Sequence, residues 1–397
     1  MSALVLGQDA STNIRGFYSF TELKGLYYGP GSLAIALPKL LDSLGRTKAL
    51  IVTGKSLHDK ASAMLSLIST YVIKSVEKVL SDHGAYGATF WEISEHAPVA
   101  GIRKCIQTMK DCGADIIVSV GGGSPIDAAK AVIHFLHKDY GGDIVPQVAI
   151  PTTLSAAEYT AGAGFTDDEG HKAVVSDPHL APAGIILDAE LTLATPERLW
   201  LASGMRAVDH AVENLYRPLE IPPMKVLCYQ ALADLFKYLP LSKADPSNVF
   251  YRQKLQVAAW MSLWPIKIER YSPVGISHAL GHKLGARYHI PHGITSCLTL
   301  APVVALKAET GSQEDKEWLA GALFHLRQPS IGSVEGDVLQ LSKSINKLVT
   351  DLGLKSSLVQ YNIPKEDIPD IVERAMGTKE DPTYQKVVKL LEGIYEQ

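Results

Sequence analysis

The segment "DIIVSVGGGSPIDAAKAVIHFL", residues 115 to 136, decides the fold class of this chain. It begins with the branched apolar residues of a buried β-strand, turns through three glycines and continues with the spacing of an α-helix. Glycine lets the backbone approach a phosphate closely, and a helix N-terminus offers free N–H groups with a favourable dipole. The segment therefore predicts a strand, a turn and a helix. The turn suits a dinucleotide pyrophosphate, although a plain tight turn has the same spacing.

Further short apolar runs with branched side chains surround this segment and predict parallel strands at residues 48–54, 145–153 and 183–188. Between two of these runs, residues 99–112 have helical spacing and stop at Gly113, which suits a helix C-cap. Strands that alternate with helices in this way are typical of βαβ units. This half of the chain therefore predicts an α/β domain with an open parallel sheet.

Helical spacing dominates the second half, in residues 223–240, 333–353 and 384–397, and strand alternation is scarce there. A chain of 397 residues is too long for one ordinary hydrophobic core. We therefore expect two domains. Residues 1–192 would form the dinucleotide-binding α/β domain, and residues 193–397 an all-α domain for substrate and catalysis.

Composition narrows the class of function. The formal charge is only −4, and no Lys/Arg run of the kind that binds nucleic acid or an anionic membrane is present. Small-molecule chemistry is therefore expected. The cysteines form no C-x-x-C pair, the N-terminus lacks the pattern of a signal peptide, and no apolar run approaches membrane-spanning length. These features favour a cytoplasmic protein without a membrane segment.

The stretch "HALGHKLGARYHIPHG", residues 278–293, contains four of the 13 histidines. On a helix, His278 and His282 share one face, and His292 follows a proline turn that can fold back toward them. His289 is the fourth histidine, and an isolated histidine is more often a surface or core residue than a catalytic one. Imidazoles arranged in this way suit a first-row divalent metal, proton transfer or plain packing. The stretch alone leaves these three interpretations open.

The phosphate-loop segment "GGGSPIDAAK" (121–130) resembles the G-G-G-S-x-x-D-x-A-K signature of the iron-containing alcohol dehydrogenase superfamily. Four further segments resemble motifs of that superfamily in the same order, at residues 150–160, 171–178, 188–213 and 278–293. The resemblance covers most of the chain from about residue 20. It implies a nucleotide-binding domain, a helical domain, a cleft between them for nicotinamide and substrate, and a homodimer.

The resemblance also implies the residues that bind NADH or NADPH. The pyrophosphate would be held by Gly121, Gly122, Gly123 and Ser124, and other parts of the cofactor would be contacted by Asp127, Thr152, Thr153 and Lys172. Relatives that prefer NAD often have an acidic residue after the first strand, where this chain has Gly54. Without that carboxylate a 2′-phosphate meets less repulsion, and Lys55 or Ser56 could receive it. Both cofactors therefore remain candidates.

Metal-dependent relatives bind iron or zinc with one aspartate and three histidines. The motif match places the histidines at His210, His278 and His292, and the aspartate at Arg206. A guanidinium cannot ligate a metal and repels a divalent ion. Asp209 lies about 100° round the helix from His210, so it is a poor substitute. The sequence therefore favours no bound metal; if one binds, the three histidines are its ligands.

The superfamily has a metal-independent branch, the maleylacetate reductases, which reduce a carbon–carbon double bond of a dicarboxylate with NADH or NADPH. Arg206 suits that branch because it can bind a carboxylate with two parallel hydrogen bonds. We expect a reductase that transfers hydride to an unsaturated or carbonyl-containing carboxylate. Arg206 would hold the carboxylate or the oxyanion, and His282 or His292 would supply a proton. His210 and His278 would shape the polar pocket.

Several alternatives stay open from the sequence. Arg206 could instead pair with Asp209 or Glu213, and Lys283 and Arg287 are further candidates for contact with the substrate. An iron- or zinc-dependent alcohol dehydrogenase or aldehyde reductase is the main alternative function. A lyase related to dehydroquinate synthase and a non-catalytic nucleotide-binding protein are the others. The sequence alone leaves the exact substrate, the preferred cofactor and the pathway open.

Overall fold

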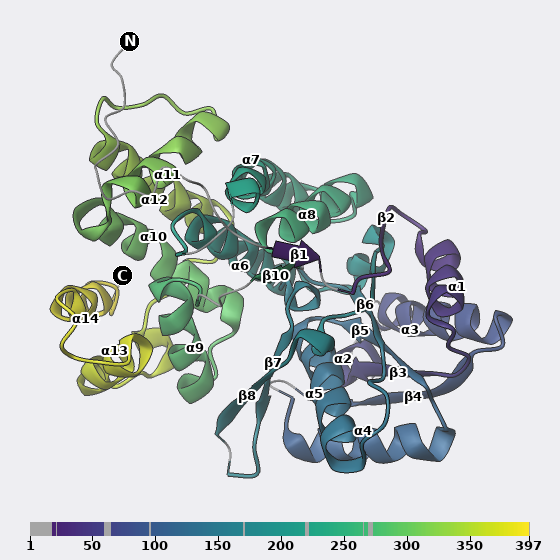
Figure 1. Cartoon of the computed structure of the whole chain (residues 1–397). Helices are drawn as coiled ribbons and strands as arrows, with labels where there is room; N and C mark the ends of the chain where they lie inside the picture. Colours follow the sequence, from purple (N-terminus) through teal and green to yellow (C-terminus); the bar gives the residue numbers. More distant parts are fainter. Residues whose placement is uncertain are drawn as a thin grey trace.

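The computed structural model describes residues 18–20, 22–58, 65–94, 97–169, 171–218, 222–264, 266–268 and 273–396. An α/β half and a mostly helical half pack against each other (Figure 1). The long helix α6 (Glu197–Leu215) lies close to the junction, at the centre of the helical half. The expected fold class is therefore confirmed, whereas the domain boundary at residue 192 stays a prediction.

Six parallel strands form the central sheet of the α/β half. Their order across the sheet is β2 (Gly25–Tyr28), β9 (Gly184–Leu187), β6 (Gln147–Pro151), β5 (Ile116–Gly121), β3 (Ala49–Gly54) and β4 (Tyr86–Ile93). All the predicted strands are present. The chain passes from β3 to β4 on one side and then returns to place β5 on the other side of β3. The direction of winding thus reverses between β3 and β5, where open α/β sheets bind ligands beyond the carboxyl ends of their strands.

Helices cover both faces of this sheet, which explains why its strands are continuous apolar runs. One face packs against α1 (Leu33–Leu44) and α3 (Leu65–Asp82), and the other against α4 (Val99–Cys112) and α5 (Gly123–Tyr140). Along β3, Ile51 points to the first pair of helices, whereas Leu50 and Val52 point to the second pair. The predicted cap at Gly113 is confirmed, because α4 ends there with a φ of 64°.

A hairpin of β7 (Gly162–Thr166) and β8 (Lys172–Ser176) extends from the sheet half, at the lower edge of Figure 1. Lys130 of α5 fixes the loop before this hairpin. Its ammonium donates to the carbonyl oxygens of Ala157 and Gly162 at 2.6 and 2.9 Å and to the hydroxyl of Thr160 at 2.9 Å. The side chain is completely buried, and burial lowers the pKa of Lys130. This lysine of the G-G-G-S-x-x-D-x-A-K segment therefore has a structural role.

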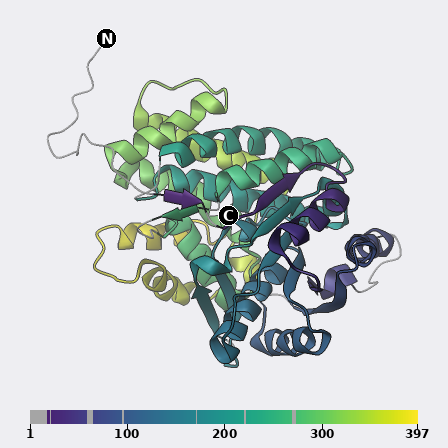
Figure 2. The ribbon, with the colours of Figure 1, turned by 45° about the vertical axis from the view of Figure 1, so that its right-hand side comes forward.

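The helical half is built around α6, in which every residue from Trp200 to Leu215 is buried. The helices that pack around it or complete this half are α7 (Pro222–Ala244), α8 (Val249–Ser262), α9 (Ile276–Tyr288), α10 (His292–Thr310), α11 (Gln313–His325), α12 (Val334–Asp351), α13 (Ile368–Met376) and α14 (Tyr384–Gly393). The expectation of an all-α half needs one correction. The strand β10 (Ile266–Ile268) pairs antiparallel with β1 (Tyr18–Phe20) from the start of the described chain (Figure 2).

Hydrogen bonds join the two halves next to the phosphate loop. The Thr195 hydroxyl donates to the carbonyl oxygen of Thr152 at 2.7 Å, and the Leu154 N–H donates to the hydroxyl of Ser203 on α6 at 3.0 Å. The loop that follows β6 is therefore fixed directly to α6. These hydrogen bonds fix the position of the phosphate-loop region relative to α6.

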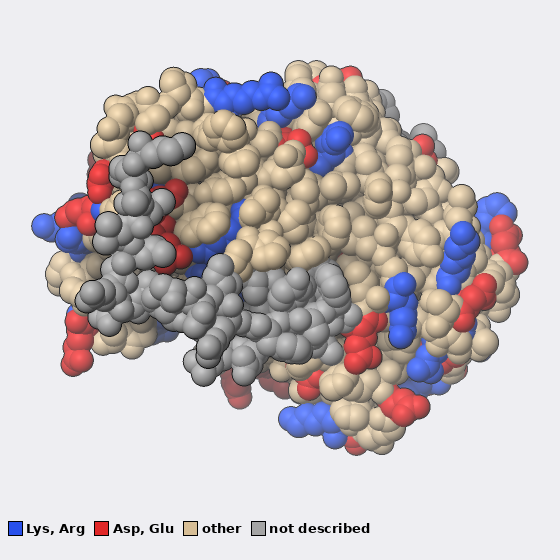
Figure 3. Space-filling view, turned by 45° about the horizontal axis from the view of Figure 1, so that its top comes forward, with Lys and Arg blue, Asp and Glu red and all other residues tan. Residues whose placement is uncertain are grey.

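The distribution of charged side chains on the surface is consistent with the expected small-molecule chemistry. On the face shown in Figure 3, Lys and Arg are interspersed with Asp and Glu and do not form one positive patch. No helix in the described part of the chain has both the length and the apolar character needed to cross a membrane.

Candidate active site

The predicted phosphate loop lies at the carboxyl edge of the sheet, at the point where the winding reverses. Helix α5 begins at Gly123 with Gly122 as an extended N-cap, and no described side chain caps its first turn. Gly122, Gly123 and Ser124 are only partly buried. Gly121 has a φ of +138°, a conformation that side chains rarely allow. The N–H groups of this helix start can therefore hold a pyrophosphate.

Thr152 and Thr153, two further predicted cofactor residues, lie against the glycine turn. The Thr152 N–H donates to the carbonyl oxygen of Gly121 at 2.9 Å. A Cβ atom added to Gly122 would lie only 3.2 Å from Cγ2 of Thr153, so a side chain at residue 122 would press on this loop. The structure therefore brings these threonines and the glycines together.

Gly54 lies across the switch point from the phosphate loop. A Cβ atom at this residue would lie 3.2 Å from the carbonyl oxygen of Ile93 and 3.9 Å from Cγ of Pro125 in the first turn of α5. Lys55 and Ser56 follow it and are exposed. In dinucleotide-binding sheets the end of the strand beside the phosphate loop contacts the ribose. The geometry therefore suits contact of this segment with the nucleoside end of a cofactor.

Asp127 contacts the middle of β7, whereas Lys172 lies at the turn end of the β7–β8 hairpin, where it pairs with Thr166. The Asp127 carboxylate accepts from the N–H of Gly164 at 3.4 Å and lies 3.5 Å from the ammonium of Lys130. Lys172 is the first residue of β8, but its side chain lies outside the described part of the structure. Asp127 therefore has a structural contact with the hairpin in addition to its predicted role.

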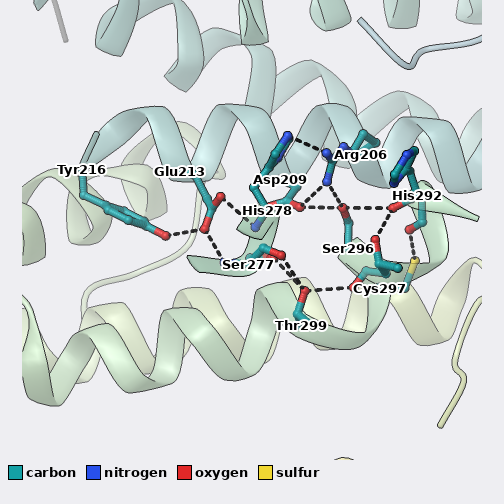
Figure 4. Close-up of polar contacts among 12 residues, drawn as sticks. Arg206, Asp209, Glu213, Tyr216, Ser277, His278, His292, Ser296, Cys297 and Thr299 are labelled. Atoms are coloured by element: carbon teal, nitrogen blue, oxygen red, sulfur yellow. Dashed lines mark hydrogen bonds and ion pairs between the residues drawn. The ribbon is translucent and has the colours of Figure 1, made fainter. Parts of the chain in front are cut away.

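The five predicted catalytic residues come from three helices, and Arg206, His278 and His292 among them are labelled in Figure 4. Arg206 and His210 come from α6, His278 and His282 from α9, and His292 is the first residue of α10. Successive ring centres along the row His210, His278, His282 and His292 are 5.1, 5.0 and 5.4 Å apart. His289, in contrast, ends α9 as an exposed residue with a φ of 55°.

Two glycines one turn apart on α9 make room for this convergence. A Cβ atom at Gly281 would lie 2.7 Å from Oγ1 of Thr295 and 3.7 Å from Nη1 of Arg206. A Cβ atom at Gly285 would lie 3.2 Å from Nδ1 of His292. The guanidinium and this imidazole therefore approach α9 where it carries no side chain.

Arg206 is buried and has polar partners from all three helices. Its Nη2 lies 2.5 Å from Nε2 of His278, and its Nη1 lies 3.4 Å from both Oδ2 of Asp209 and the hydroxyl of Ser296. The Ser296 hydroxyl also donates to Asp209 at 2.5 Å. Since a guanidinium only donates, Nε2 of His278 accepts and its ring proton belongs on Nδ1. The alternative interpretation, in which Asp209 is the partner of Arg206, matches this contact.

The same contacts set the charge state of the imidazoles. Burial and the charge of Arg206 hold the pKa of His278 and of His210 well below the usual range of histidine. Both rings are therefore neutral at physiological pH. Arg206 supplies the fixed positive charge of this part of the site.

The predicted alternative metal ligands do not fit a divalent ion in this arrangement. The nitrogen lone pair of His278 that would bind a metal accepts an N–H of Arg206. Among the residues that the structure describes, His210, His278 and His292 are also not a group whose ligand atoms all lie within 4.8 Å of one another. Two ligands at about 2.1 Å from one ion are at most about 4.2 Å apart.

Asp209, Glu213 and His278 do form such a group, which the sequence did not predict. Carboxyl oxygens of this group already accept hydrogen bonds from other parts of the protein. Both oxygens of Glu213 accept backbone N–H groups, from Ser277 at 2.8 Å and from His278 at 3.1 Å. Burial raises the pKa of Glu213 to about 8 and also raises the pKa of Asp209. Since these oxygens already accept hydrogen bonds and Nε2 of His278 faces Arg206, this group too is better suited to protein contacts than to an ion.

Of the other candidates for substrate contact, Arg287 forms ion pairs with Asp367 and Asp370, both at 2.8 Å, which fasten α9 to α13. Lys283 is exposed on α9. Sequence reasoning missed Ser296, because its contact with Asp209 joins two helices that are far apart in the sequence. The sequence suggested Glu213 only as a possible partner of Arg206, whereas in the structure its carboxyl group binds N–H groups at the start of α9.

Comparison with known families gives matches along nearly the whole chain. The family model described as iron-containing alcohol dehydrogenase matches residues 24–189. The model for the C-terminal domain of Fe-containing alcohol dehydrogenases matches residues 200–395.

Similar proteins include maleylacetate reductase 2 of Cupriavidus pinatubonensis, which is 30% identical over 297 residues that cover 75% of each chain. Dehydrogenase ALT3 of Alternaria alternata is 27% identical over 75% of this chain and 89% of its own length. Among solved structures, a 1,3-propanediol oxidoreductase superposes with a TM-score of 0.84, at 23% identity over 96% of this chain and all of its own. A maleylacetate reductase from Agrobacterium tumefaciens gives a TM-score of 0.76, at 23% identity over 96% and 98% of the two chains. These structural matches show a shared fold.

Proposed function

Because this chain belongs to the iron-containing alcohol dehydrogenase family, we propose that it is a metal-independent, NAD(P)H-dependent reductase of unsaturated or carbonyl-containing carboxylates. Family membership and the similarity to maleylacetate reductases identify it as an oxidoreductase. That class argues against the lyase and the non-catalytic alternatives. The observation that carries the finer proposal is the contact between Nη2 of Arg206 and Nε2 of His278, at the predicted metal position.

NADH or NADPH, when bound, supplies the hydride. The N–H groups of Gly122, Gly123 and Ser124 would hold the pyrophosphate at the start of α5, where the helix dipole favours an anion. Thr152 and Thr153 would fix the adjoining loop. Gly54 and the exposed Lys55 would lie toward the ribose, so this end of the site would discriminate between the two cofactors.

Arg206 would hold the substrate or stabilise its developing charge. When hydride reaches an electron-poor carbon conjugated with a carbonyl group, negative charge grows on the carbonyl oxygen. A buried cation stabilises that charge more in the transition state than in the ground state. Asp209 offsets part of the charge of Arg206 in the free enzyme, but the 3.4 Å contact is long for an ion pair. A substrate carboxylate or oxyanion can therefore compete for the guanidinium.

His282 and His292 would provide the proton that completes the reduction. They lie at the end of the histidine row away from His210, with ring centres 5.4 Å apart. Either imidazolium would give its proton to the enolate that remains after hydride addition, and would be recharged from solvent. His278 would keep Arg206 in place through its Nε2. The proposed homodimer and the cytoplasmic location stay predictions from the sequence.

The experiment that tests this function distinguishes a reaction that depends on a bound metal from one that depends on Arg206. The purified protein is treated with a chelator, its metal content is measured, and maleylacetate is added while the nicotinamide absorbance of NADH or NADPH is followed. We expect oxidation of the cofactor at the same rate with and without added iron or zinc. Activity that returns only with metal, or that occurs only with simple aldehydes plus metal, would show instead a metal-dependent alcohol dehydrogenase.

A further inference from the structure

The N-terminus of α9, the helix that carries His278 and His282, is capped by a side chain from another helix. Its own N-cap residue is Gly275, which has extended backbone and no side chain to accept a hydrogen bond. Glu213 of α6 supplies the acceptors, with Oε1 bound to the N–H of Ser277 at 2.8 Å and Oε2 to the N–H of His278 at 3.1 Å. These are the second and third residues of the helix, whose N–H groups a cap normally satisfies.

The surroundings of Glu213 are shaped for this contact. A Cβ atom at Gly275 would lie 2.5 Å from Oε1 of Glu213 and 2.6 Å from the hydroxyl of Tyr216, so a side chain there would displace the carboxyl group. The Tyr216 hydroxyl donates to the same Oε1 at 2.8 Å and fixes its orientation. Gly275 and Tyr216 thus leave Glu213 in one position, facing the start of α9.

The result is that α6 holds His278 at both ends. Glu213 binds its backbone N–H, and Arg206, two helical turns earlier on α6, binds the ring at Nε2 (Figure 4). The neighbouring Ser277 hydroxyl lies 2.9 Å from that of Thr299 on α10, which ties the same turn to a third helix.

We propose that Glu213 is a positioning residue for the reductase reaction, which sets the start of α9 and thereby the place of the His278 ring beside Arg206. This inference rests on the proposed function. Without the carboxylate, the first turn of α9 loses its acceptors, and the imidazole is free to move away from the guanidinium. The phosphate loop belongs to the other half of the protein, and we expect cofactor binding to stay unchanged.

The test compares the Glu213→Gln variant with Ser333→Ala, in which a different helix loses its cap. Ser333 accepts from the N–H of Gly336 at the exposed start of α12, far from the histidines in sequence. Three quantities are measured: the dissociation constant of NADPH, kcat with maleylacetate, and amide hydrogen exchange of peptides that contain the first turns of α9 and α12.

We expect Glu213→Gln to lower kcat about tenfold to a hundredfold, as a misplacement of about 1 Å can. Its NADPH dissociation constant should stay within about twofold of the wild-type value. Exchange should accelerate at the start of α9. Ser333→Ala should accelerate exchange at the start of α12 alone and keep the wild-type kcat. Wild-type kcat in Glu213→Gln, or unchanged exchange in α9, would overturn the proposal.

If Glu213→Gln does not fold, Tyr216→Phe decides, because it removes only the hydroxyl that orients the carboxyl group. A kcat lowered several-fold with an unchanged KM for NADPH supports the proposal, and a wild-type kcat contradicts it. Wild-type protein that binds NADPH but reduces no carboxylate would contradict the proposed function alone. The exchange measurement would still show whether Glu213 holds the start of α9.

Discussion

Nη2 of Arg206 and Nε2 of His278 lie 2.5 Å apart, although the two residues are separated by 72 positions in the sequence. The contact places a permanent cation on the lone pair with which this histidine would bind a metal. The family motif has an aspartate at the position of Arg206, so one substitution changes both the charge of the site and the availability of the histidine. Asp209 and Ser296 then hold the guanidinium from the remaining side.

The first prediction is that Arg206→Asp converts the site into a metal site. The change removes the cation, releases Nε2 of His278 and restores the carboxylate that metal-dependent relatives have. We expect the variant to retain about one equivalent of zinc or iron after dialysis, and the wild-type protein to retain none. Its metal-free activity toward a carboxylate should fall about a hundredfold or more, because a charged hydrogen-bond donor at the developing charge is lost.

Metal analysis of the dialysed proteins checks this prediction, with Lys283→Asp as the control. Lys283 is exposed on α9, so this change introduces the same carboxylate outside the row of histidines and should not create metal binding. Tight zinc binding by the wild-type protein, or no binding by the Arg206→Asp variant, would show that Arg206 does not decide the metal content.

Much of the α/β half follows from the sequence, because burial of both sheet faces produces continuous apolar runs that end at glycines. Pairs on one helix, such as Arg206 with His210 or His278 with His282, also follow from the helical repeat. Contacts between helices do not. The bond from Ser296 to Asp209 and that from Glu213 to α9 depend on how α6, α9 and α10 cross. The pairing of β1 with β10 was equally invisible, since each strand has only three residues.

The second prediction concerns the loop after Thr153. Ala156 is completely buried and has a φ of 63°, in the left-handed region that costs a residue with a Cβ about 1–2 kcal/mol. Ala156→Gly relieves this cost, but it adds freedom to the unfolded chain and removes a buried methyl group, each of which costs about 0.5–1 kcal/mol. We therefore expect little net change in the free energy of unfolding. Thermal unfolding measures it, with Ala163→Gly in β7 as the control, because that variant loses a buried methyl group without relief of a positive φ and should destabilise by about 1 kcal/mol or more. Equal losses of melting temperature in the two variants would contradict the expected relief.

The third prediction is a pH dependence of stability that comes from Glu158. Burial raises the pKa of Glu158 to about 7, even though the nearby Lys130 opposes the shift. The folded protein therefore keeps a proton that the unfolded chain loses above about pH 4.5, and stability falls as pH rises from there to about 7. Glu158→Gln should remove this loss, with an advantage on the order of 1–3 kcal/mol at neutral pH and little effect near pH 4.

Urea unfolding across this pH range measures the effect of Glu158→Gln. The half-exposed Glu373, which pairs with Lys379 at the surface, provides the control Glu373→Gln, for which the slope should match that of the wild type. If Glu158→Gln keeps the wild-type slope, the carboxyl group is ionised in the folded protein.

The last prediction separates backbone strain from cofactor binding at the two ends of α5. Gly121 and Gly141 both have positive φ, 138° and 66°, so an alanine at either position should destabilise the fold by about 1–3 kcal/mol. A Cβ atom at Gly141 meets nothing within 4 Å, whereas one at Gly121 lies 3.0 Å from Cγ of Pro125 in the first turn of the helix. Only Gly121→Ala should therefore disturb the N–H groups proposed to hold the pyrophosphate, and weaken NADPH binding about tenfold or more. Calorimetric titration of both variants with NADPH, below their unfolding temperatures, measures the difference. Equal affinities in the two variants would mean that the pyrophosphate binds elsewhere.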